Sequence, residues 1–202
     1  LKAKEQHLST LSDQLFYLRE AGVIKDGLII TGMNDPRTSA GQRLERGIWF
    51  ASASIDGSPA MMAAAEEEVR TQLDGLFESL EFIDTDHPIQ NPDPEYLKVI
   101  MDMYNGVPTN YALETMCTLG GVELGENELD IDLYKKVPGF VCSLPAVPFE
   151  GSKITEIIAA LDKIAQDIQV EPYYNFVGIA PTALEGFFRV FFDRNDPEAI
   201  QK

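Results

Sequence analysis

Short apolar segments with strand character alternate with amphipathic helical segments along the whole chain. Strands are expected at residues 27–31, 47–55, 80–83, 140–144, 173–179 and 187–192. The first helix precedes Gly22 and carries leucines at spacings of three and four: Leu8, Leu11, Leu15 and Leu18. Because the order strand, strand, helix, strand recurs, the pattern predicts an α+β fold with helices packed on one side of a sheet.

Two further helices are marked by their apolar faces. The first begins after the turn Asp56-Gly57, where Ser58 can cap the helix and Pro59 suits the first helical position. Its predicted buried face consists of Met62, Ala65, Val69, Leu73 and Leu76. The predicted buried face of the second helix consists of Ile154, Ile157, Leu161, Ile164 and Ile168.

The middle of the chain is less regular. A proline-rich loop is expected at residues 86–94, and helices at 95–104 and 110–118. Residues 105–109 form a tight turn between these helices, and residues 120–136 are expected to form a solvated acidic loop.

Charge and length narrow the class of protein. The 202 residues include 33 acidic and 16 basic side chains, which gives a formal net charge of −17. This charge excludes nucleic acid and anionic membrane surfaces as partners. The length favours one domain, and no apolar run is long enough for a membrane-spanning helix. The two cysteines leave the compartment open between cytoplasm and periplasm. A start without methionine and an end inside a helix beginning near Pro197 suggest a piece of a longer protein.

Familiar catalytic motifs are absent from the sequence. There is no glycine-rich phosphate loop, no Gly-x-Ser-x-Gly turn and no His-Glu-x-x-His pair. His7 and His87 are interpreted as surface residues, and no metal site is predicted. Cys117 and Cys142 fit best as small buried residues. The polar groups of Tyr173, Tyr174 and Asn175 interrupt an apolar strand, so they line a pocket or reach partners at the edge of the core.

A family resemblance emerges from the order of several local patterns. Residues 11–24 resemble the segment that enters the cap domain of the vanillyl-alcohol oxidase and 4-cresol dehydrogenase (p-cresol methylhydroxylase) family of FAD-linked oxidases. Further landmarks follow in the same order over nearly the whole chain: Gly47-Ile48-Trp49, Asp56-Gly57, Asn105-Gly106-Val107-Pro108-Thr109, Leu144-Pro145, Ala180-Pro181 and residues 190–198.

The resemblance implies that residues 1–202 are a single cap domain with an antiparallel sheet and flanking helices, of the ferredoxin-like kind found at the C-terminus of FAD-linked oxidases. Its first partner would be an N-terminal FAD-binding domain of the same protein. That protein would oxidise a para-substituted phenol or related alcohol by hydride transfer to FAD. A second copy of the chain or a cytochrome electron acceptor would be compatible further partners.

Residue by residue, the resemblance implies substrate contacts from Phe140, Cys142, Tyr174, Asn175 and Glu185. It implies cofactor contacts from Thr109, Met116 and Cys117. No complete catalytic set is expected, because the phenolate-binding tyrosine and arginine of the family fall beyond Lys202 or in the other domain. The isolated chain should therefore be inactive.

The chain departs from the family at positions that matter for chemistry. Ala112 stands where the family has a glutamate, and Met116 stands near its flavin-linking tyrosine. Gly139 and Phe140 stand where another member links FAD through histidine. None of these side chains can form the bond, so the FAD is expected to be noncovalent, with Cys117 as the exception to test. The pocket acid falls on Asn175 or Phe176, and the pocket histidine near Glu185 or Gly186.

Two other hypotheses remain open at this point. One is a non-catalytic α+β module for ligand binding or dimerisation. The other is an acidic hydrolase with Cys117 or Cys142 as nucleophile, although no histidine is placed in sequence to activate either thiol.

Overall fold

The computed structural model describes residues 1–25, 27–32, 47–83, 106–108, 117 and 137–201. The chain divides into two compact units, Leu1–Leu80 with Phe140–Phe191, and Glu81–Gly139 with Phe192–Gln201. The described elements are β1 (Lys2–Lys4), η1 (Glu5–His7), α1 (Leu8–Glu20), β2 (Ile29–Gly32), β3 (Ile48–Ser52), α2 (Pro59–Gln72), β4 (Gly139–Ser143), β5 (Ala146–Pro148), α6 (Gly151–Asp167), β6 (Tyr173–Ala180), β7 (Ala183–Phe192) and α7 (Pro197–Gln201).

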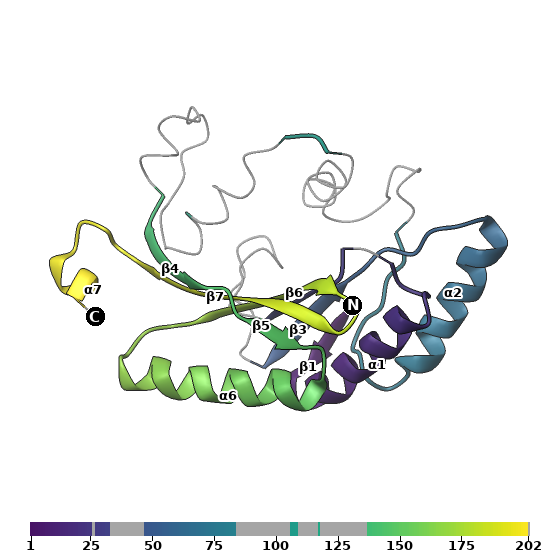
Figure 1. Ribbon diagram of the computed structural model, residues 1–202, viewed down its shortest axis with the longest axis horizontal. Coiled ribbons are helices and arrows are strands. Elements are labelled where there is room, and N and C mark those ends of the chain that lie inside the picture. The colour runs from purple at the N-terminus through teal and green to yellow at the C-terminus, as the bar shows by residue number, and fades with distance from the viewer. Residues whose placement is uncertain (26, 33–46, 84–105, 109–116, 118–136, 202) are drawn as a thin grey trace. The chain divides into compact units, whose positions relative to one another are not determined.

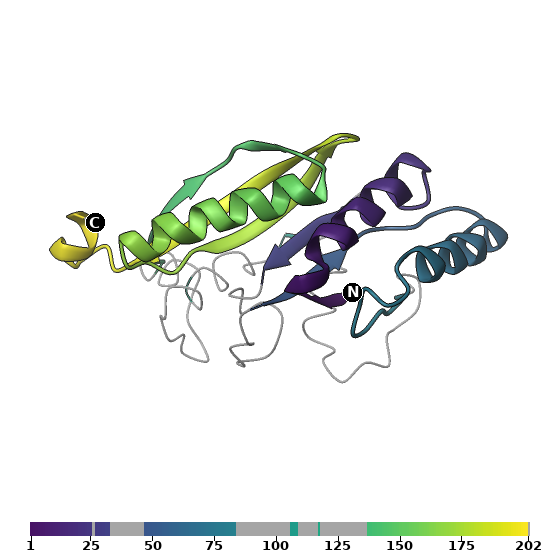
Figure 2. The ribbon, with the colours of Figure 1, turned by 90° about the horizontal axis from the view of Figure 1, so that it is seen from below.

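The first unit is built on a seven-stranded sheet with the order β1-β3-β2-β6-β7-β4, and β5 also pairs with β7. The pairings of β1 with β3, β2 with β3 and β6, and β7 with β5 and β6 are antiparallel. Helices α1 and α6 lie side by side on one face of this sheet (Figures 1 and 2). The α+β prediction is therefore confirmed.

An aromatic cluster fills the layer between the sheet and these helices. The indole of Trp49 stacks on the ring of Tyr174, with ring centroids 6.5 Å apart and an interplanar angle of 13°. Phe188 meets Tyr174 at 5.9 Å and Phe176 at 5.5 Å, both edge to face. Phe176 is completely buried. Rings of this size in edge and stacked contacts make this cluster the main apolar core beneath the helices.

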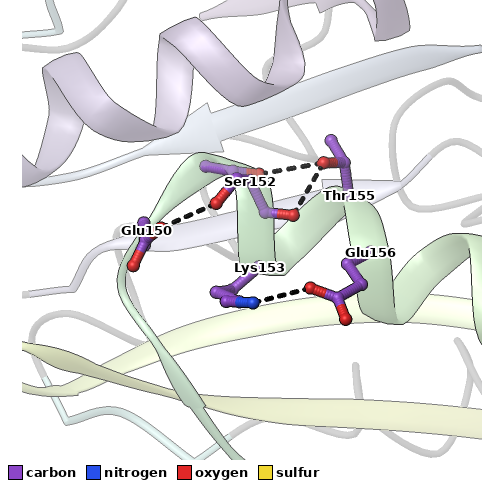
Figure 3. Close-up of polar contacts among 6 residues, drawn as sticks. Glu150, Ser152, Lys153, Thr155 and Glu156 are labelled. Atoms are coloured by element: carbon purple, nitrogen blue, oxygen red, sulfur yellow. Dashed lines mark hydrogen bonds and ion pairs between the residues drawn. The ribbon is translucent and has the colours of Figure 1, made fainter.

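The beginning of α6 is held by a set of local polar contacts (Figure 3). The Ser152 hydroxyl donates to Glu150 Oε1 at 2.7 Å, and Lys153 pairs with Glu156 at 2.8 Å. Thr155 Oγ1 donates to the carbonyl oxygens of Gly151 and Ser152 at 3.1 and 3.0 Å. None of these contacts uses the backbone N–H of Gly151, the first residue of the helix. That N–H group therefore needs a partner outside α6.

The predicted start of α2 is confirmed. The Ser58 hydroxyl accepts a hydrogen bond from the backbone N–H of Met61 at 3.4 Å, and Pro59 is the first helical residue. Of its predicted face, Val69 and Leu73 are buried, whereas Met62 is only half-buried.

The predicted buried face of α6 is wrong in its second half. Ile164 is 55% exposed and Ile168 is 42% exposed, while Ile158 and Ala165 are buried. The buried stripe therefore begins at the predicted Ile154 but continues through Ile158 and Ala165 instead of Ile164 and Ile168.

The strand predicted at residues 80–83 is also wrong. Residues 80–83 have no strand structure, and Ser79 forms only an isolated antiparallel bridge with Lys2. Ile83 is exposed and Leu80 and Phe82 are half-buried, so none of these apolar side chains lies in the core.

Most of the irregular middle of the chain lies outside the described residues. This applies to the predicted loop at 86–94, the helix at 95–104, the acidic stretch, and the helix at 110–118 apart from Cys117. Within the predicted turn, Gly106 has a φ of +71°, a conformation that favours glycine. In the described ranges, no helix has the length and apolar character that crossing a membrane requires.

Candidate functional site

The sheet has a second face, turned away from α1 and α6, which we call the distal face. Tyr174 donates a hydrogen bond to Asp162 of α6 at 2.7 Å, so alternate residues of β6 on its register point toward the helices. Tyr173, Asn175 and Val177 therefore point to the distal face. Their antiparallel partners share that face: Arg189, Phe187 and Glu185 on β7, and Thr31 and Ile29 on β2.

Asn175 lies near the centre of the distal face. It is directly flanked across the sheet by Thr31 on β2 and Phe187 on β7. Asn175 is 6% exposed and Thr31 is 8% exposed. Within the part of the chain that the structure describes, Asn175 Oδ1 has no hydrogen-bond partner. A buried amide oxygen without a partner carries a desolvation cost, and such positions in proteins call for a specific explanation.

Charged groups stand at both diagonals of Asn175. Arg189 is the partner of Tyr173 and Glu185 is the partner of Val177, each two residues along the strand from Asn175. Burial lowers the pKa of Arg189, and the nearby Cys142 thiol raises it. An arginine side chain nevertheless keeps its charge near neutral pH. The distal face therefore combines the cationic Arg189, the acidic Glu185 and the neutral amide of Asn175 at neighbouring positions of β6 and β7.

Cys142 belongs to the same face. Burial raises the pKa of its thiol; the Arg189 charge lowers that pKa, and Glu185 raises it. The overall direction is upward, so the thiol remains protonated near neutral pH. Because the thiolate is the nucleophilic form, this environment disfavours the hypothesis of a hydrolase that uses Cys142.

Aromatic rings line the distal face near β4. The ring of Phe191 lies 5.4 Å from that of Tyr173 in an edge arrangement, and 6.0 Å from that of Phe140. Phe140 is 45% exposed although it is a large apolar side chain. This end of the face therefore offers an accessible aromatic surface beside Arg189.

Four of the five predicted substrate-binding residues share the distal face: Phe140, Cys142, Asn175 and Glu185. Tyr174 points to the opposite face, which corrects the expectation that it lies with the other four. Successive side chains of a strand point to opposite faces, so Tyr174 lies in the layer under α6, where Asp162 accepts its hydroxyl proton. Phe176 is also buried, whereas Phe140 is 45% exposed.

Sequence reasoning missed Arg189 and Thr31 as members of this face. Arg189 could have been found from the hairpin, because β6 and β7 are joined by only Pro181 and Thr182. Counting back from that turn, with allowance for the irregularity near Gly178, places Arg189 opposite Tyr173. Thr31 carries no such signal, since β2 pairs with a strand more than 140 positions later in the sequence.

Of the three predicted cofactor-binding residues, the structure describes only Cys117. Thr109 and Met116 lie outside the described residues. Cys117 is completely buried. Among the residues that the structure describes, no three side chains that could ligate a metal form a group.

Comparison with known proteins supports the fold. No protein-family model matches the chain, and no curated protein matches it in sequence. The isoeugenol complex of 4-ethylphenol oxidase from Gulosibacter chungangensis superposes with a TM-score of 0.71 at 12% identity, over 98% of this chain and 40% of that one. Substrate-bound p-cresol methylhydroxylase superposes with a TM-score of 0.58 at 13% identity, over 99% of this chain and 40% of that one.

The chain thus spans about 40% of the length of the two enzymes that it matches. At these identities the likeness establishes a shared fold. It confirms, at the level of the fold, the resemblance to the vanillyl-alcohol oxidase and 4-cresol dehydrogenase family that the order of the sequence landmarks indicates.

Proposed function

We propose that the chain is the substrate-facing domain of an FAD-dependent oxidoreductase that oxidises a para-substituted phenol or a related alcohol. The observation that carries the proposal is the distal face. On a fold shared with 4-ethylphenol oxidase, one sheet surface gathers the exposed ring of Phe140, the buried amide of Asn175 and the charged side chains of Arg189 and Glu185. An aromatic substrate with a polar substituent has the matching chemistry.

The residues of the distal face have distinct roles in this proposal. Phe140 and Phe191 contact the flat face of an aromatic ring and exclude water from it. Arg189 supplies a positive charge that favours the phenolate over the phenol, which eases the loss of a hydride from the para substituent. Glu185 lies two residues from Phe187 on the same face, where its carboxylate can exchange a proton with the substrate or water.

The same surface fits a planar cofactor held without a covalent bond. Phe140 presents an exposed ring, and the neighbouring Cys142 thiol has a raised pKa, which makes it a poor nucleophile toward the cofactor. FAD, when bound, supplies the hydride acceptor. The FAD would be held mainly by a second, N-terminal domain of the same protein, consistent with the greater length of the matched enzymes.

The test uses the full natural protein that contains this chain. Anaerobic addition of 4-ethylphenol should bleach its visible flavin absorbance, and acid precipitation should release the yellow flavin into the supernatant. If the flavin stays in the pellet and Cys117→Ala releases it, the attachment is covalent and that part of the proposal is wrong. A full protein without flavin would contradict the proposed function and leave the non-catalytic binding module.

A matched pair of variants tests the distal face. Phe140→Ala removes a ring from this face and should raise the KM for 4-ethylphenol about tenfold. Val141→Ala is the control, because Val141 is the next residue of the same strand, points to the opposite face and is also exposed. Equal KM values for the two variants would contradict the assignment of the distal face to the substrate.

A further inference from the structure

Helix α6 carries a second row of side chains, on a different side of the helix from its buried stripe. We call this row the outer stripe, and its members recur at alternating spacings of four and three residues: Lys153, Ile157, Ala160, Ile164 and Asp167. Ile157 is half-buried and the other four are exposed. This spacing is the one by which two helices pack along their length. The outer stripe therefore has the pattern of a helix–helix contact.

The charges along this side of α6 are arranged in a self-complementary order. Lys153 and Asp167 stand at the two ends of the outer stripe, and Glu156 and Lys163 lie along one flank of it, seven residues apart. All four are exposed. Two copies of α6 laid antiparallel about Ala160 place Lys153 opposite Asp167 of the second copy. The same arrangement places Glu156 opposite Lys163 of the second copy.

The helix dipole favours the same arrangement. The first turn of α6 carries Lys153 and no acidic residue, and its last turn carries Asp167 and no basic residue, which is the reverse of what the dipole favours. An antiparallel second copy brings a lysine to the end that lacks one. Lys153 pairs with Glu156 at 2.8 Å (Figure 3). Because exposed ion pairs contribute little to stability, a second copy can share these two side chains at small cost.

We propose that α6 packs antiparallel against α6 of a second copy of the protein, about a two-fold axis that passes near Ala160. Two-fold symmetry gives both copies the same contact surface, as the charge order requires. The 17 residues of α6 provide a contact about 25 Å long. The net charge of −17 makes most surfaces of two copies repel, whereas this side of α6 alternates in sign. The inference does not depend on the proposed reaction.

Charge reversal in the full natural protein tests the pairing by sedimentation equilibrium. The wild-type protein should form a dimer that dissociates on dilution. Lys153→Glu with Lys163→Glu makes this side of α6 wholly acidic, and Glu156→Lys with Asp167→Lys makes it wholly basic. Each double variant alone should associate at least about tenfold more weakly, because like charges then face each other. An equimolar mixture of the two double variants should regain the association of the wild type.

Two controls separate the outer stripe from general effects of charge and fold. Glu67→Lys with Asp74→Lys makes the same change in charge as the basic variant, at exposed positions in and after α2, and should leave the dimer unchanged. Under mild oxidation, Ala160→Cys should give a disulfide-linked dimer. Ala159→Cys should not, because the preceding residue is exposed but points about 100° away. Both cysteine variants keep the same native cysteines.

The outcomes decide the inference even if a charge variant does not fold, which thermal unfolding shows, because the two cysteine variants then give the answer. A wild-type protein that is monomeric at about 100 μM overturns the inference. A dimer that persists unchanged in both folded double variants also overturns it, as does equal cross-linking of Ala160→Cys and Ala159→Cys. If Ala160→Cys is monomeric and also unreactive toward a maleimide, another part of the same protein covers the outer stripe and the inference is wrong.

Discussion

The carboxylate of Asp13 accepts a hydrogen bond from the backbone N–H of Gly151 at 2.7 Å, across 138 positions of sequence. Asp13 lies on α1 and Gly151 is the first residue of α6, so one helix caps the other. Four N–H groups at a helix start lack partners within the helix, and the helix dipole favours an anion there. This contact joins two helices that lie on the same side of the sheet, opposite the distal face.

Removing the cap should cost stability without altering the distal face. Asp13→Ala should lower the free energy of unfolding by about 1 kcal/mol, and Asp13→Asn by less, because the amide keeps an acceptor. Chemical denaturation measures both changes. Thr10→Ala, an exposed position on the same helix, is the control and should change stability little. Equal losses for Asp13→Ala and Thr10→Ala would contradict the role of the cap.

The crossing of α1 and α6 also depends on the absence of a side chain at Gly151. A Cβ atom there would clash with the backbone carbonyl of Ser9 on α1, which cannot rotate away as a side chain could. Gly151→Ala should therefore destabilise the protein by about 1–3 kcal/mol. Ser152→Ala, at the next and exposed position, provides the comparison. Thermal unfolding should place the midpoint for Gly151→Ala clearly below that for Ser152→Ala.

Glu78 should make stability depend on acid pH. A hydrogen bond from Lys2 is the main cause that lowers the pKa of Glu78 from its usual 4.5; its carboxylate pairs with Lys2 at 3.2 Å and Lys4 at 3.5 Å. A lowered folded-state pKa means that the stabilisation is complete above the unfolded-state value and is lost as the pH falls through the folded-state value.

Glu78→Gln should consequently lower the melting temperature slightly at neutral pH and by less near pH 3, because the stabilisation is lost as the pH falls through the lowered pKa of Glu78. Glu67→Gln, at an exposed position of α2, should be neutral at both pH values. A constant difference between wild type and Glu78→Gln from neutral pH to about pH 3 would show that the ion pair contributes nothing.

The two faces of the sheet should differ sharply in what their aromatic rings contribute. Phe176 is completely buried under the helices, so Phe176→Ala should cost about 3–5 kcal/mol. Phe140 keeps much of its surface in solvent, so Phe140→Ala should cost less than about 1 kcal/mol. Parallel denaturation curves measure the contrast. A comparable loss at both positions would mean that Phe140 is a core residue.

Local signals predicted much of this fold because the chemistry that starts an element is encoded in adjacent residues. The Ser58 and Pro59 pair marked the beginning of α2, and the four leucines of α1 are all buried. The buried face of α6 was not predictable in the same way. Isoleucines occupy both possible stripes, and the choice depends on which residues meet α1 and β6. Ala165 lies on the buried stripe although it contributes less apolar surface than the exposed Ile164.

The sequence predicted the strand that carries the candidate site, but it did not show which side chains of that strand share one face of the sheet. Tyr174 and Asn175 were equally plausible pocket residues, because alternation tells that adjacent side chains diverge without telling which one faces the helices. The hydrogen bond from Tyr174 to Asp162 decides the matter, and it involves a helix formed by a different part of the sequence. The neighbours of Asn175 likewise come from β2 and β7, so the sequence around Asn175 could not reveal them.

The short bridge between Ser79 and Lys2 has a consequence for self-association. The backbone groups of Glu78, Ser79 and Lys2 bond to one another along the outer side of β1, with Lys2 N–H donating to the Ser79 carbonyl at 2.9 Å. An outermost strand with unpaired backbone groups is a template for adding a strand from another molecule. At β1 that template is already occupied. Loss of the bridge, as in a partly unfolded chain, would leave the backbone N–H and C=O groups of Lys2 unpaired at the edge of the sheet.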